Sequence, residues 1–143
     1  MLGPETEQRD REEAGMQTVL FNGDGGTISA EVRCGFANPG SYILRLWEKD
    51  SNDKAMPDVE GNFINADDDE HDLPDPASLN EGRIVETFVT MSPLPGTKQY
   101  FASLRIIQDN QLLADVSVSN ATDQHSVTVD LFVKLEPKPV GDV

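Results

Sequence analysis

The sequence predicts an all-β fold: an antiparallel β-sandwich of seven or eight strands with one long acidic loop. Polar and apolar residues alternate along most of the chain, which is the period of a strand with one wet face and not the 3.6-residue period of a helix. The apolar runs are short, and glycine, proline and asparagine residues separate them. Many short strands in one chain are typical of a sandwich, here immunoglobulin-like or jelly-roll-like.

Each strand is predicted from its own run of residues. Clean alternation predicts strands at 27–34, 42–46, 100–106, 112–118 and 126–135, and less regular runs add strands at 17–22 and 83–91. A short eighth strand at Asn62–Asn65 is optional. On the apolar faces of these strands, the residues expected to be almost fully buried are Leu104, Val116, Val129 and Leu131.

The hairpin between the strands at 100–106 and 112–118 can turn in two ways. A two-residue turn at 109–110 sets Leu104 opposite Asp115, so the two apolar faces point to opposite sides of the sheet. A three-residue loop at 108–110 sets Leu104 opposite Ala114 and keeps both apolar faces on one side. Because a one-residue slip moves every side chain to the other face, we expect the three-residue loop.

The chain has the size of a single domain. Residues 1–15 are polar and acidic and are expected to form a flexible N-terminal segment. Residues 16–136 are expected to form the sandwich, interrupted by an acidic insertion loop at 50–82. Residues 137–143 are expected to be a tail, because their prolines remove donors that a sheet ladder needs.

The location of the protein stays open. No apolar run is long enough to cross a bilayer, so we expect no membrane insertion. The first residues lack the basic and then apolar pattern of a secretory signal, although a signal can be removed from a mature chain. An extracellular or assembly-bound location is as compatible with the sequence as a cytoplasmic one, and Cys34, the only cysteine, allows no intrachain disulfide.

Two thirds of the net charge of −15 is concentrated in one segment. Residues 50–82 contain eleven acids and one base, a balance of −10. A salt-adapted protein is expected to spread its acids over the whole surface, so this clustering has a local cause. The field of these acids repels phosphate backbones, and we expect no nucleic-acid partner.

The acidic segment could hold a cation or could be a solvated loop. Its best-placed carboxylates for calcium are those of Asp67, Asp69, Asp72 and Asp75. An EF-hand loop that began at Asp67 would have Asp72 where glycine is required and Ser78 where glutamate is required. We therefore expect residues 66–76 to be an exposed, solvated loop. The alternative is a calcium site gathered from several loops.

No pattern in the sequence predicts an enzyme or a cofactor other than calcium. The glycines of Asn22–Gly26 lead into a strand and not into a helix, so they predict a turn and not a phosphate loop. Cys34, His71 and His125 do not have the spacing of a zinc site. Cys34 is expected to be a small buried residue, because it lies on the apolar face of its strand.

Large apolar side chains on the polar faces of strands are the most unusual feature. They are Trp47, Phe101, Phe132, Ile43 and Ile107. Either the segment at 50–82 or a terminus covers them, or they form a surface for a partner. One Trp and two Tyr are few for a sugar-binding platform, so protein contacts are favoured.

These observations predict a non-catalytic β-sandwich module with a structural or protein-binding role. Its partner would be another protein or a second copy of the chain, for example within a larger assembly. The alternative function is a calcium-dependent module that binds carbohydrate or protein through the acidic loop at 58–75.

Overall fold

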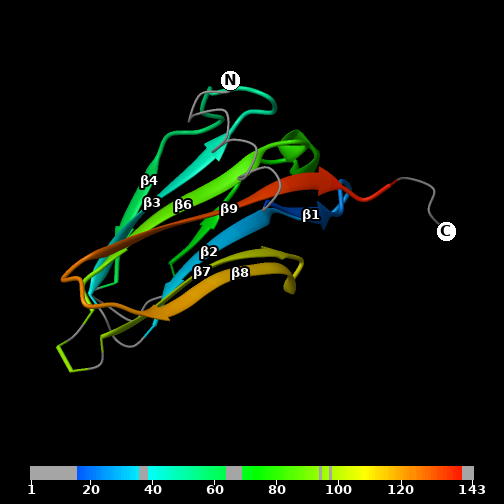
Figure 1. Ribbon diagram of the computed structural model, residues 1–143. Helices are drawn as coiled ribbons and strands as arrows, with labels where there is room; N and C mark the ends of the chain where they lie inside the picture. Colours follow the sequence, from blue (N-terminus) through cyan, green and yellow to red (C-terminus); the bar gives the residue numbers. More distant parts are fainter. Residues whose placement is uncertain (1–15, 36–38, 64–68, 94, 97, 140–143) are drawn as a thin grey trace, which may run out of the picture.

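The computed structural model describes residues 16–35, 39–63, 69–93, 95–96 and 98–139. They form a β-sandwich of two sheets (Figure 1). The five-stranded sheet has the order β1-β9-β6-β3-β4, and the four-stranded sheet has the order β5-β2-β7-β8. The strands are β1 (Gln17–Phe21), β2 (Ile28–Cys34), β3 (Gly40–Trp47), β4 (Val59–Asn62), β5 (Asp69–Asp72), β6 (Ile84–Met91), β7 (Gln99–Gln108), β8 (Gln111–Ala121) and β9 (Val127–Pro137).

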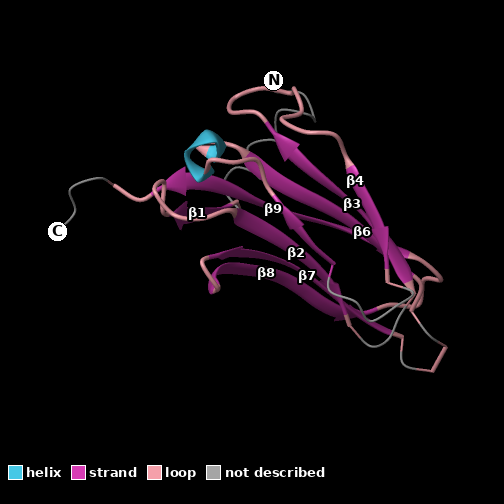
Figure 2. Cartoon of the chain, turned by 180° about the vertical axis from the view of Figure 1, so that it is seen from behind, coloured by secondary structure: helices cyan, strands magenta, loops and turns pink. Residues whose placement is uncertain are grey.

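The predicted sandwich is confirmed, and all seven strands predicted outside the optional one are present. The two sheets lie as separate layers, and the core fills the space between their apolar faces (Figures 1 and 2). Strict alternation is clearest in β6, where Val85, Thr87, Val89 and Met91 are buried and the residues between them are half-buried. A 3-10 helix, η1 (Ala77–Asn80), is the single helix of the described residues, and it is too short to cross a membrane.

The first and last strands lie side by side. β1 pairs with β9 in parallel, with Gln17 opposite Val133 and Phe21 opposite Pro137. β9 thus runs one residue into the predicted tail, because at Pro137 the only paired neighbour is β1 and no second ladder needs the missing N–H. All other strand pairs are antiparallel.

The predicted glycine turn at Asn22–Gly26 carries the chain from one sheet to the other. The buried Gln108 side chain holds this turn: its Oε1 accepts from the Asn22 N–H at 2.9 Å, and its Nε2 donates to the Gly26 carbonyl at 3.0 Å. A Cβ atom at Gly26 would lie 2.6 Å from the Asp109 carboxylate, so a side chain there would push aside the carboxylate that accepts from the Gly26 N–H at 3.1 Å. Turn and hairpin therefore pack as a unit.

The predicted three-residue loop between β7 and β8 is wrong. The turn has two residues, Asp109 and Asn110, with φ angles of 52° and 64°, the left-handed pair of a type I′ hairpin. A β-bulge follows, because Leu113 is an extra residue that has no partner on β7. The bulge sets Leu104 opposite Val116, so the apolar faces coincide as expected although the register differs by two residues.

The acidic segment contains two strands, so the prediction of an exposed loop at 66–76 is wrong. β4 overlaps the optional strand at Asn62–Asn65 by one residue and pairs with β3. β5 pairs with β2, with Asp69 opposite Val32 and Asp72 opposite Ser29. Further along, Leu73 is buried in the core. Asp67 and the rest of 64–68 lie outside the described residues.

Two of the four residues predicted to be nearly fully buried are only half-buried. Leu104 and Leu131 are buried, but Val116 and Val129 are not. Val116 lies on the edge strand β8, and Val129 lies in the half of β9 that pairs with β6 alone. Both side chains therefore have a neighbouring strand on one side only.

Candidate functional site

The outer face of the five-stranded sheet brings together three of the five predicted surface residues. Ile43 and Trp47 point outward from β3, and Phe132 points outward from β9. In the middle strand β6, Glu86 lies opposite Phe132, and Ile84 lies opposite Trp47. All of these side chains are half-buried.

An open hollow of about 750 Å³ lies on this face, between Trp47 and Phe132. Its other lining residues come from the start of the described chain, from the segment after β3, from the turn before β6 and from strands β6 and β9: Met16, Thr18, Glu48, Asp50, Ser51, Asn52, Gly82, Ile84, Glu86 and Lys134. We call it the Trp47 hollow. Three acids and one base among its lining residues give it a formal charge of −2.

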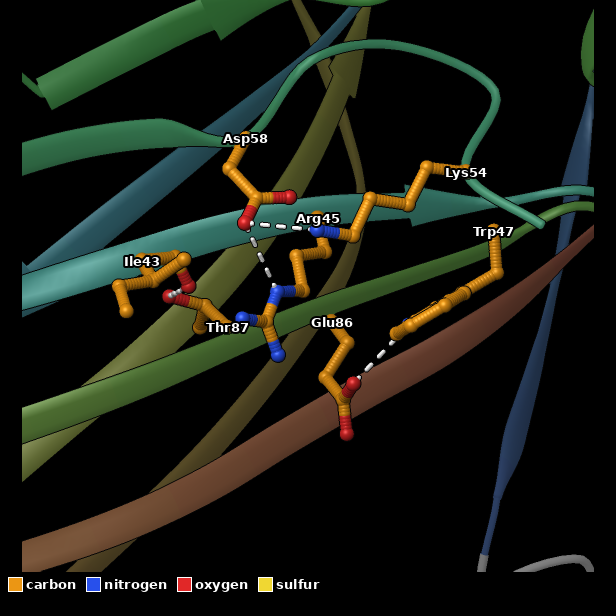
Figure 3. A network of polar contacts seen from close by, with 7 residues as sticks. All are labelled: Ile43, Arg45, Trp47, Lys54, Asp58, Glu86 and Thr87. Carbon is orange, nitrogen blue, oxygen red and sulfur yellow. Dashed lines mark hydrogen bonds and ion pairs between the residues drawn. The ribbon is translucent and has the colours of Figure 1, made fainter. Parts of the chain in front are cut away.

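Polar contacts fix the side chains beside the Trp47 hollow (Figure 3). Trp47 Nε1 donates to Glu86 Oε1 at 3.0 Å, which ties the indole ring to the middle strand. At the rim, Arg83 Nε lies 2.7 Å from Glu48 Oε1. Thr87, on the inner side of β6, donates to the Ile43 carbonyl at 3.1 Å. Trp47 is therefore held in place and is not a freely rotating surface side chain.

The segment after β3 covers part of the same face. Asp58 accepts from Lys54 Nζ at 3.0 Å and from Arg45 Nε at 3.2 Å (Figure 3). These hydrogen bonds and the two positive charges lower the pKa of the Asp58 carboxyl. The Arg45 guanidinium lies 5.4 Å from the centre of the Phe88 ring, an aromatic residue on this face that the sequence analysis missed. Of the two alternatives, cover by the segment at 50–82 is present over Arg45, whereas the described residues leave the Trp47 hollow open beside it.

The other two predicted surface residues lie on the opposite side of the molecule. Phe101 and Ile107 point outward from β7, in the four-stranded sheet. Between them Arg105 Nη1 lies 3.3 Å from Glu31 Oε1, and Arg105 Nε lies 3.7 Å from Asp115 Oδ2. The five residues therefore belong to two surfaces and do not form one.

The acids proposed as calcium ligands make other contacts. Asp72 accepts from the Ser29 hydroxyl at 3.0 Å, and Asp75 accepts from the Thr27 hydroxyl at 2.9 Å. Asp69 lies beside Tyr42, and Asp67 lies outside the described residues. Within the described ranges, no group of three His, Cys, Asp or Glu side chains could hold a metal ion.

A polar cluster lies where β5 meets the five-stranded sheet. The Tyr42 hydroxyl is hydrogen-bonded to His71 Nε2, and the Phe63 ring lies 5.4 Å from the Tyr42 ring. A Cβ atom at Gly61 would collide with the Tyr42 ring, so only glycine fits there. Burial, together with the charge and the hydrogen bond of Asp69, raises the pKa of Tyr42 to about 12.

Cys34 is half-buried at the end of β2, and burial raises the pKa of its thiol to about 11. Since the thiolate is the nucleophilic form, this environment suppresses its reactivity.

No family model, curated protein or solved structure matches this chain.

Proposed function

We propose that this chain is a non-catalytic protein-binding module that takes a short segment of a partner protein into the Trp47 hollow. The observation that carries the proposal is the pair of aromatic side chains, Trp47 and Phe132, that line an open hollow on the outer face of the five-stranded sheet. Half-buried aromatic residues in a hollow are the side chains that contribute most to protein–protein binding.

The charges around the hollow indicate the chemistry of the partner. Glu48, Asp50 and Glu86 outnumber the one lysine, Lys134. Glu86 is fixed by its hydrogen bond from Trp47, so its charge is held next to the aromatic ring. A segment that combines an apolar anchor with an arginine or lysine side chain suits this arrangement, because charge complementarity favours both encounter and register.

A phage-displayed library of random linear peptides, panned on the full chain, tests the proposal. We expect enrichment of peptides that combine apolar and basic residues, with saturable binding reported by the fluorescence of Trp47, the single tryptophan. Phe132→Ala is expected to weaken binding by about fivefold or more, since truncating a central aromatic residue costs over 1 kcal/mol.

The matched control is Phe101→Ala, which removes the same type of side chain from the other sheet. It should leave peptide binding unchanged. Enriched peptides that bind the Phe132→Ala variant as tightly as the original protein would contradict the proposal, and so would a library without any enriched peptide.

A further inference from the structure

The outer edge of β8 is a long row of backbone groups that no described strand pairs with. β8 has eleven residues and is the outermost strand of its sheet (Figure 1). It contains no proline or glycine, and Asp115 is its one charged residue. Unpaired N–H and C=O groups on a strand of this length are a template for the addition of another strand.

The opposite edge of the same sheet lacks these properties. β5 has four residues, and each of them, Asp69 to Asp72, has an ionisable side chain. Pro74 and Pro76 follow directly and interrupt any longer ladder. Short length, charge and proline are the devices by which proteins keep sheet edges from pairing. β5 therefore has three protections. β8 has one, the bulge at Leu113 near its start, and the eight residues after it, 114–121, pair regularly with β7 and include a single charged residue, Asp115.

We infer that β8 pairs antiparallel with β8 of a second copy of this chain, which joins two four-stranded sheets into one sheet of eight strands. The inference does not depend on the proposed function, because β8 and the Trp47 hollow belong to different sheets.

The residues of β8 favour another β8 as the added strand, and they favour one register of pairing. With Val116 on the two-fold axis, Ala114 lies opposite the partner's Val118 and Asp115 lies opposite the partner's Ser117. Side chains of the same face then meet, and no acid faces an acid. An axis at Asp115 would set two carboxylates against each other, which is unfavourable. The half-buried Val116 and Val118 would be covered by their counterparts.

The acidic β5 strands lie far from this pairing. Neighbouring strands lie about 4.8 Å apart, so in the dimer the two β5 strands are seven spacings, about 34 Å, from each other. That distance is several times the screening length of about 8 Å at physiological ionic strength. The acids of β5 therefore face away from the β8 interface.

Molar mass measured by sedimentation over a range of concentrations tests the inference, with three substitutions at exposed positions. We expect the original chain to dimerise. Ser117→Asp sets two pairs of acids opposite each other and should weaken dimerisation by about 2- to 30-fold, at about 0.2–1 kcal/mol per pair. Ser117→Lys sets lysine opposite the partner's Asp115 and should leave dimerisation unchanged or tighten it.

Ser119→Asp is the matched control, because it adds the same charge to the same strand but opposite the partner's Leu113. It should weaken the dimer less than Ser117→Asp does. A chain that is monomeric at every concentration overturns the inference, and so does a dimer that is equally insensitive to all three substitutions. Because both serines are exposed, each variant should remain folded, and its unfolding curve checks this.

Discussion

β5 and β8 are both edge strands of the four-stranded sheet, and they are attached to the rest of the molecule by different chemistry. β5 directs Asp69 and His71 toward the Tyr42 hydroxyl of the other sheet, so polar contacts connect this edge to the core. β8 directs Ala114, Val116 and Val118 inward and is connected by apolar contacts. The acidic β5 thus depends on specific polar partners for its place in the sheet. The apolar β8 packs through nonspecific apolar contacts, and these leave its outer edge able to pair with another strand.

The largest expected effect is a loss of stability on truncating a side chain in the interior of the four-stranded sheet, and the same truncation at the β8 edge should have almost no effect. Leu104 is fully buried on β7, and Leu104→Ala should lower the free energy of unfolding by about 2–5 kcal/mol. Leu112, on β8, is 49% exposed. In dilute protein, Leu112→Ala should change the free energy of unfolding by less than about 0.5 kcal/mol. Chemical denaturation measures both. Equal losses would show that β8 is not an edge.

A change at high pH tests the polar attachment of β5. The pKa of Tyr42 is raised from 10.0 to about 12, so between these values the folded chain keeps a proton that the unfolded chain has lost. The contribution of Tyr42 to stability should be complete below pH 10 and should fall as the pH rises to about 12. Denaturation at several pH values, compared with Tyr42→Phe, measures it. Identical profiles for the two proteins would contradict this account.

Removing two charges of β5 should weaken the protection of this edge. In Glu70→Gln/Asp72→Asn, the asparagine keeps an acceptor oxygen for the Ser29 hydroxyl, and the strand loses two charges, so β5 should pair more readily. With β8 already paired, light scattering should then detect species larger than a dimer. Stability should change by less than about 0.5 kcal/mol.

Asp50→Asn/Asp53→Asn is the control for that variant, because it removes two charges from an exposed loop that belongs to neither edge. If both variants associate equally, net charge and not the β5 edge limits association.

The smallest expected effect concerns calcium. We expect calcium to shift the melting temperature no more than sodium does at equal ionic strength, since screening alone acts on the acidic segment. A saturable, calcium-specific rise that is lost in Asp67→Asn/Asp69→Asn/Asp72→Asn would show a cation site there instead.

The difference between apolar and acidic strands also explains which parts of the fold could be predicted from the sequence. Strands such as β6 and β9 could be predicted, because their apolar residues recur with the two-residue period of a half-buried strand. β5 could not, since aspartate disfavours strands and the compensating partners, Ser29 and Tyr42, come from distant strands.

The candidate site divides in the same way. Trp47 and Phe132 were found because a large apolar side chain at a polar position is a local signal. The lining residues Glu48 to Asn52 have no such signal, because only the fold brings that segment next to Trp47. Phe88 was missed since its strand alternates less clearly in the sequence, where it stands between Thr87 and Val89.

The parallel pairing of β1 with β9 determines when the protein can finish folding. Among the described strands β1 is the first, yet its only partner in the sheet is the last, β9. During synthesis β1 must wait unpaired until almost the entire described chain has left the ribosome. Contacts between such distant residues slow folding, and an unpaired strand is open to aggregation while it waits.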